Sequence, residues 1–161
     1  MIEGHHVHLV GHLKDDSLMS QQMLIVESDQ AISKLFEQWL KDMGFQATSV
    51  RDGGEAMQTL GSQSIEGMIL DLQIPVMNGL TMLTQLRQRY ADIPVIVLAG
   101  VDMTDDLLEA LESGAQDYLT KPVSQQLFKQ KCRRVFLNRH GKKPEPNPQT
   151  YGHEKFKPEL N

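Results

Sequence analysis

A chain of 161 residues with 40% hydrophobic residues is long enough for one domain with a single core and tails. No apolar run approaches the roughly 18 residues of a membrane span, and no secretory signal is evident. Cys132 is the only cysteine, which excludes an intramolecular disulfide and favours a cytoplasmic setting. The net charge of −5 divides into −11 over residues 1–128 and +6 over residues 129–161. The acidic body disfavours nucleic acid as its ligand, and the basic end is typical of a solvated helix face leading into a linker.

Two terminal segments differ in composition from the rest of the chain. Residues 1–22 are polar and contain a group of histidines (His5, His6, His8 and His12), but no scaffold that fixes a metal geometry. We interpret this stretch as a leader or tag-like segment. Residues 139–161 contain four prolines and few apolar residues, which is typical of a linker. One domain, residues 23–138, lies between these segments.

From Met23 onward, short apolar runs alternate with segments of helical period. The runs are typical of buried strands. They cover Met23–Val26, Ala47–Val50, Met68–Leu70, Val95–Leu98 and Tyr118–Thr120.

A helix is expected after each run. The first has apolar residues from Ile32 to Met43, with Asp29 as its N-cap and Gly44 as its stop. The others are expected around Glu55–Leu60, at Leu80, Leu83 and Leu86, at Leu107, Leu108 and Leu111 before Gly114, and from about Ser124 through Leu127, Val135 and Phe136. The order is five consecutive βα units.

This alternation predicts an α/β fold with a doubly wound, five-stranded parallel sheet and helices on both faces. Right-handed crossovers favour the flavodoxin-like (βα)5 arrangement with strand order 2-1-3-4-5. Ligands of such sheets bind at the carboxyl ends of the strands, near the point where the strand order reverses. The first and third strands flank that point.

Charged residues follow three of the predicted strands. Glu27 and Asp29 follow the first strand, Asp71 the third, and Lys121 the fifth. If these strand ends meet, the carboxylates suit Mg²⁺, which prefers oxygen ligands. Asp71 is then a candidate nucleophile for a phosphoryl group, and Lys121 a candidate to stabilise the transferred charge.

Each of these residues alone also has an ordinary structural explanation. Asp71 is compatible with a turn, Lys121 with a solvated position, and Glu27 and Asp29 with helix capping. It is the coincidence of three strand ends that favours a functional site. Nucleotide-binding loops of the types G-x-G-x-x-G and G-x-x-x-x-G-K-[ST] do not occur.

The core, about residues 23–137, resembles a response-regulator receiver domain. The matching segments are "MLIVESDQ", "MILDLQIPVMNGL", "IPVIVLAG" and "ALESGAQDYLTKP". The resemblance implies that Asp71 receives a phosphoryl group from a phosphohistidine on a sensor histidine kinase or phosphotransfer protein, and that Lys121 contacts that group. It also implies a cis bond before Pro122, Tyr118 as the aromatic switch residue, and a backbone carbonyl of Gln73 as a ligand of Mg²⁺.

Two positions depart from the family's pattern. Ser28 stands where the family usually has a second acidic residue, the direct metal ligand, so Mg²⁺ binding is expected to be weakened. Glu27 remains as the first acid, and Asp29 is expected to cap a helix. Ala99 stands where the family has Thr or Ser, and it has no hydroxyl for a phosphoryl oxygen. Phosphoryl acceptance is therefore expected with an altered readout.

Three functions are open on this basis. The first is a phosphoacceptor in a two-component phosphorelay, not an enzyme apart from slow self-dephosphorylation. The second is a pseudo-receiver that acts as a protein-interaction module independently of phosphate. The third is a phosphohydrolase, which Gln73 disfavours because such enzymes usually have a second Asp there. The resemblance also implies an output domain or partner and a homodimer through the fourth helix, fifth strand and fifth helix.

Overall fold

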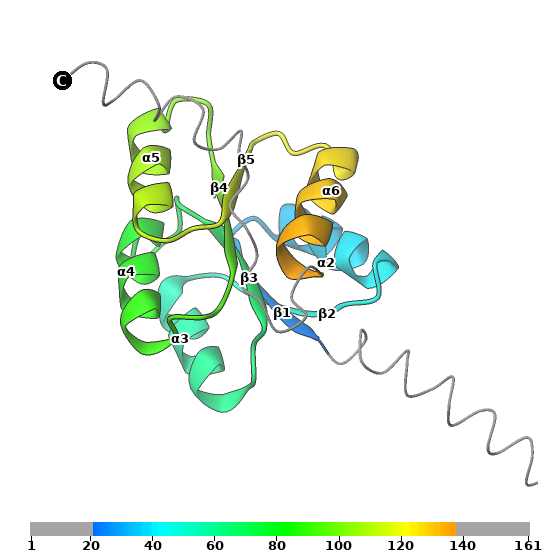
Figure 1. Ribbon diagram of the computed structural model, residues 1–161, viewed down its shortest axis with the longest axis horizontal. Coiled ribbons are helices and arrows are strands. Elements are labelled where there is room, and N and C mark those ends of the chain that lie inside the picture. Colours follow the sequence, from blue (N-terminus) through cyan, green and yellow to red (C-terminus); the bar gives the residue numbers. More distant parts are fainter. Residues whose placement is uncertain (1–20, 138–161) are drawn as a thin grey trace, which may run out of the picture.

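The apolar runs of the sequence pair into one parallel sheet. The computed structural model describes residues 21–137, and its strands follow the order β2-β1-β3-β4-β5 (Figure 1). The strands are β1 (Gln22–Val26), β2 (Gln46–Val50), β3 (Gly67–Asp71), β4 (Val95–Ala99) and β5 (Asp117–Thr120). The predicted flavodoxin-like order is confirmed. The proposed leader and tail fall almost entirely outside the described residues.

Five helices connect and follow the strands. They are α2 (Gln30–Asp42), α3 (Gly53–Ser62), α4 (Gly79–Arg89), α5 (Thr104–Glu112) and α6 (Gln125–Phe136). Four begin at a side-chain cap, since Asp29, Asp52, Asn78 and Ser124 each accept a backbone N–H bond from the first turn. The cap at Asp52 starts α3 earlier than the apolar pattern indicates. Within residues 21–137, no helix combines the length and the apolar character of a membrane span.

The helices form two layers around the sheet. Figure 1 shows α2 and α6 on one face and α3, α4 and α5 on the other. Under α2 and α6, Phe36 and Phe128 stack with ring centroids 4.7 Å apart, and Trp39 packs against both. The opposite face holds a second cluster that includes Leu70, Met82 and other aliphatic side chains. The two clusters explain why β3 and β4 are buried along their whole length.

The register of the sheet aligns the carboxyl ends of its central strands. Val26 pairs with Leu70, Asp71 with Leu98, and Ala99 with Thr120. The residues that follow β1, β3 and β5 therefore meet at one edge. This edge is where the sequence places its charges.

Candidate phosphoacceptor site

Lys121 joins the carboxylates that follow the other two strands. Its Nζ lies 2.7 Å from Asp71 Oδ2 and 3.0 Å from Glu27 Oε1. Asp71 and Glu27 are each only 2% exposed, so these interactions are poorly screened by water. The convergence expected from the sequence is present, and the Lys121–Pro122 peptide bond is cis, as the resemblance implies.

The loop after β3 is built around the Asp71 carboxylate. The backbone N–H of Gln73 donates to Asp71 Oδ1 at 3.0 Å, which holds the side chain in a turn. The loop closes where Gly79 N–H donates to Leu72 O at 3.0 Å. A Cβ on Gly79 would lie 2.5 Å from Leu72 Cα and 2.8 Å from Asp71 O, so only glycine allows this approach. Gly79 is not among the site residues predicted from the sequence, although Asn-Gly before a helix is a recognisable signal.

Burial and ion pairing shift the ionisation of this cluster. Burial raises the pKa of Glu27, and the nearby Asp71 carboxylate raises it further, against the opposing bonds from Asp29 N–H and Lys121. Burial by itself lowers the pKa of Lys121, but its hydrogen bonds to Asp71 and Glu27 outweigh this and raise the pKa. The lysine is therefore held in its charged form between two carboxylates.

The residues after Glu27 do not add a second acid to the site. Asp29 accepts a bond from Ile32 N–H as the N-cap of α2, and its own N–H donates to Glu27 Oε2 at 2.9 Å. The expectation that Asp29 caps a helix is confirmed. Ser28 is half-buried and lines a recess of about 380 Å³ together with Glu27. Across residues 21–137, no three His, Cys, Asp or Glu side chains gather as a metal cluster.

The donor set nevertheless fits a hard divalent cation. Glu27 Oε1 is buried, pairs with Lys121 Nζ at 3.0 Å and has no other hydrogen-bond partner among the described residues. A buried carboxylate oxygen in this state is a ready ligand for a cation. Two carboxylates and a backbone carbonyl are ligands that Mg²⁺ accepts when water completes its shell.

Ala99 and Tyr118 lie on one face of the sheet. Tyr118 pairs with Val97, Ala99 pairs with Thr120, and Tyr118 packs against the aliphatic cluster that contains Ala99. Ala99 is buried and has no polar atom in its side chain. Position 99 therefore offers no polar group toward Asp71.

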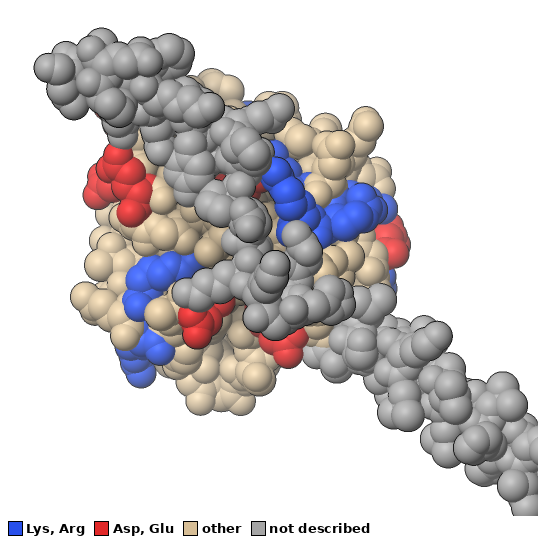
Figure 2. All heavy atoms as spheres, viewed as in Figure 1, with Lys and Arg blue, Asp and Glu red and all other residues tan. Residues whose placement is uncertain are grey.

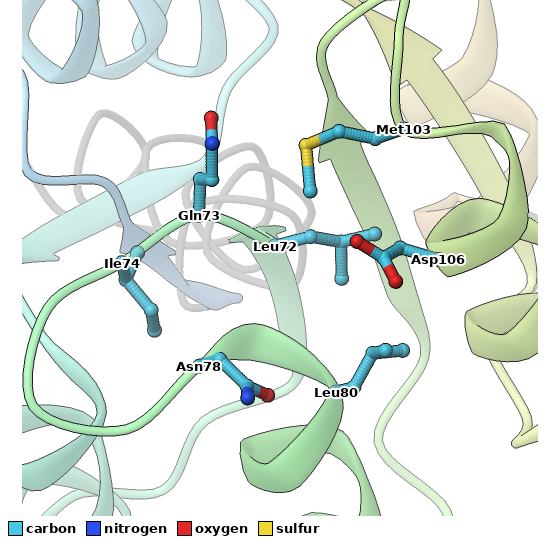
Figure 3. A pocket seen from close by; sticks show the side chains of 7 residues that line it. All are labelled: Leu72, Gln73, Ile74, Asn78, Leu80, Met103 and Asp106. Carbon is cyan, nitrogen blue, oxygen red and sulfur yellow. The ribbon is translucent and has the colours of Figure 1, made fainter.

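A pocket of about 520 Å³ opens beside the site and not at it. Figure 3 shows the side chains of Leu72, Met103 and Asp106 directed into it from the β3–α4 loop and the start of α5. Neither Asp71 nor Lys121 lines this pocket. Its wall mixes apolar side chains with the polar ones of Gln73, Asn78 and Asp106, and it borders the candidate site through Gln73.

One residue departs from the solvated basic face that the sequence indicated on the last helix. Arg133 is exposed, as expected, but Lys131 is only 9% exposed, so the expectation is wrong for this lysine. Lys131 Nζ lies 3.1 Å from Asp117 Oδ1, and Arg134 Nη2 lies 2.7 Å from Asp117 Oδ2. Asp117 is fully buried, so its negative charge draws both cations toward β5.

The comparisons with known proteins agree with this geometry. The sequence profile described as "Response regulator receiver domain" matches residues 23–133. The chain is 34% identical over 108 residues to the transcriptional regulatory protein PrrA of Mycobacterium tuberculosis, covering 67% of this chain and 46% of PrrA. It is 36% identical over 106 residues to the Regulator of RpoS of Escherichia coli K12, covering 66% and 32%. The chain thus spans less than half the length of these relatives.

Solved receiver domains share the fold. The receiver domain of the Francisella response regulator 1452 superposes with a TM-score of 0.68 at 27% identity, covering 73% of this chain and 98% of that one. The receiver domain of the sensor histidine kinase PA1611 from Pseudomonas aeruginosa superposes with a TM-score of 0.66 at 25% identity and the same coverage. That protein holds a magnesium ion in its active site cleft.

The chain belongs to the response-regulator receiver domain family. It is a receiver domain of a two-component system. Receiver domains are typically signalling domains without enzymatic activity, they typically bind Mg²⁺, and they interact with histidine kinases and output domains.

Proposed function

We propose that Asp71 accepts a phosphoryl group from a phosphohistidine of a sensor histidine kinase or phosphotransfer protein. A carboxylate oxygen of Asp71 attacks phosphorus, the N–P bond breaks, and the leaving imidazole takes up a proton. Lys121 stabilises the phosphoryl oxygens, because its ammonium already lies 2.7 Å from the attacking carboxylate. That contact is the observation that carries the proposal. Hydrolysis of the acyl phosphate by water slowly restores Asp71.

Mg²⁺ belongs to the same proposal. Glu27, Asp71 and the backbone carbonyl of Gln73 would hold it, and the magnesium ion in PA1611 supports the assignment by analogy. When bound, the cation offsets charge on the incoming phosphoryl group. Ser28 contributes no charge, so we expect weaker binding than a site with a second acid provides.

An altered readout follows from Ala99. Without a hydroxyl at this position, the phosphoryl group loses a hydrogen bond of about 1.5–3 kcal/mol. Conformational couplings are themselves only about 1–3 kcal/mol. Ser28 and Ala99 together favour the second candidate, a pseudo-receiver that binds partners independently of phosphate. The first candidate, a phosphoacceptor, is favoured by Asp71, Lys121 and Tyr118.

The proposal extends to the partners of this domain. We propose a cytoplasmic protein that contacts a kinase or phosphotransfer protein, acts through an output domain or partner, and pairs with a second copy through α5, β5 and α6. Figure 2 shows acidic side chains over α5 and basic ones toward α6. The acids of α5 include Asp105 and Glu109, and the bases of α6 include Arg133. The two sets are complementary when one copy is rotated onto another.

Intact-mass measurement tests the phosphoacceptor. The protein is incubated with acetyl phosphate over a range of Mg²⁺ concentrations. We expect wild type to gain the mass of one phosphoryl group, Asp71→Asn to gain none, and Asp29→Asn to behave as wild type. No gain on wild type at any Mg²⁺ concentration would favour the pseudo-receiver, and a gain that persists in Asp71→Asn would move the acceptor elsewhere.

A further inference from the structure

Tyr118 lies on the free edge of the sheet. β5 is the last strand in the order, so it has a neighbouring strand on one side only. Two side chains satisfy the backbone of Tyr118: its N–H donates to Asp117 Oδ1 at 2.8 Å, and its carbonyl accepts from Lys131 Nζ at 2.5 Å. The side chains of α6 and β5 thus replace the missing strand at this residue.

Lys131 reaches around this edge from the opposite layer. Lys131 is on α6, which contributes to the aromatic cluster on one face of the sheet. The Tyr118 ring packs on the other face, against the cluster that contains Ala99. Lys131 Nζ lies 4.2 Å from the centroid of the Tyr118 ring. The same ammonium pairs with Asp117, which Arg134 holds from its other oxygen. Because the buried cation is held by an ion pair, a carbonyl and a ring, neither the Lys131 side chain nor the Tyr118 ring has much freedom to move.

The space around the ring shows that this position is not imposed by packing alone. A cavity of about 250 Å³ adjoins Tyr118 and is lined mainly by small and aliphatic residues: Gly100, Val101, Thr104, Leu107, Leu108, Leu111 and Thr120. The ring therefore has room to leave its place against Lys131. Ala99, on the same face, has no hydroxyl that links the ring's position to the phosphoacceptor.

We propose that Lys131 is a positioning residue that sets the place of the Tyr118 ring, in the role that a hydroxyl at position 99 cannot fill. The ring is then controlled from α6 and not from Asp71. A phosphoryl group on Asp71 leaves Tyr118 where it is, while a partner that draws Lys131 away from Asp117 releases it. The part that concerns phosphorylation rests on the proposed function, and the part that concerns Lys131 does not.

Fluorine NMR on protein labelled with 3-fluorotyrosine tests the role of Lys131 without any phosphodonor. Tyr118→Phe assigns the resonance. We expect Lys131→Met, which keeps length and removes the cation, to shift or broaden the Tyr118 resonance by more than its linewidth. Lys131→Arg should stay close to wild type, and so should Lys129→Met, the same change on the same helix. An unchanged resonance in Lys131→Met overturns the proposal.

Two additions keep the test decisive. If Lys131→Met does not fold because Asp117 is left short of a partner, the double variant Asp117→Asn/Lys131→Met removes the stranded charge and takes its place. Beryllium fluoride with Mg²⁺, a mimic of a bound phosphoryl group, should shift the Asp71 amide of wild type and leave the Tyr118 resonance unchanged. Control by Lys131 is overturned if beryllium fluoride moves the Tyr118 resonance of wild type as far as the Lys131→Met substitution moves it. An unmoved Asp71 amide counts against the phosphoacceptor alone, because the comparison of variants decides the role of Lys131.

Discussion

Residue 28 sets how much negative charge faces a cation at the candidate site. Glu27 and Asp71 supply two carboxylates, and Lys121 neutralises about one of them in the absence of metal. Ser28 directly follows Glu27 after β1 and is half-buried, so a carboxylate at this position would add a third negative charge next to that pair. We therefore expect the charge at this one position to separate a strong metal site from a weak one.

We expect Ser28→Asp to raise the affinity for Mg²⁺ by at least about tenfold, which corresponds to about 1.4 kcal/mol. The physical reason is attraction between the new carboxylate and the divalent cation, about 8 kcal/mol at 4 Å with an effective dielectric of 20 and less where water enters. Titration calorimetry measures it. Ser28→Asn, with the same shape and no charge, should bind as wild type, and equal gains in both variants would contradict an electrostatic cause.

Position 99 offers a matched pair of variants. Thr and Val have the same shape, so both add similar bulk to this buried position and only Thr adds a hydroxyl. We expect Ala99→Thr to bind beryllium fluoride with Mg²⁺ at least about tenfold more tightly than Ala99→Val, from a bond to a charged group of about 1.5–3 kcal/mol. Calorimetric titration at saturating Mg²⁺ gives both constants. Equal affinities would mean that position 99 does not reach the phosphoryl group.

Glu27 makes stability depend on pH. An acid whose pKa is raised in the folded protein adds stability at low pH, and this contribution is lost as the pH rises from its ordinary value of 4.5 through the raised pKa. Glu27→Gln has no such proton to lose. Without Mg²⁺, the variant should therefore gain in melting temperature relative to wild type as the pH rises from 4 to 7. A difference that stays constant with pH would contradict the raised pKa.

At the scale of elements, one arginine connects three segments of the chain. The Arg87 guanidinium, on α4, donates to Ile93 O at 2.7 Å, Gly114 O at 2.8 Å and Gln116 Oε1 at 3.3 Å. It thereby joins the loop before β4 to the loop before β5. Gly114 has φ of 111°, and a Cβ there would lie 2.7 Å from Arg87 Nε, so the loop needs glycine on both counts.

We expect Arg87→Ala to lower the free energy of unfolding by about 2–4 kcal/mol, because two short charge-assisted bonds are lost and their carbonyls are left unpaired. Arg87→Lys should recover only part, since one ammonium does not match the planar fork. Arg89→Ala on the same helix is exposed and should cost less than about 1 kcal/mol. Urea unfolding followed by Trp39 fluorescence measures all three. A loss for Arg87→Ala no larger than for Arg89→Ala would rule out the connecting role.

At the scale of the whole molecule, charge is divided between two helices that flank β5. Reversal of Glu109 or Arg133 should raise the dissociation constant of the proposed dimer about tenfold or more, because like charges then face each other. The double variant Glu109→Arg/Arg133→Glu should recover wild-type association, and Lys41→Glu on α2 should leave it unchanged. Sedimentation equilibrium is the measurement. A double variant as weak as the single ones would place the interface elsewhere.

The spacing of apolar residues and the helix-capping residues were enough to predict the architecture. Runs such as Val95–Leu98 are apolar without alternation because both faces of a central parallel strand are covered, and this pattern is local. Caps such as Asp29 act within one turn of a helix, so they too are visible in the residues alone. The meeting of Asp71 with Lys121 was also predictable, because the flavodoxin-like strand order suits five βα units with right-handed crossovers and both residues lie at carboxyl ends of strands.

Contacts across layers needed the folded chain. Lys131 belongs to a basic run that is typical of a solvated face, but Asp117 and Tyr118 on the edge strand hold it in a buried position. Gly79 lies against the backbone of Leu72 across a closed loop, and Arg87 donates to the carbonyl of Gly114, which is distant in the sequence. No periodicity of the sequence predicts such contacts. Residue patterns report which face of an element is buried. They do not report which charge, ring or carbonyl that face contacts. Those contacts depend on how the layers pack, which is a property of the folded molecule.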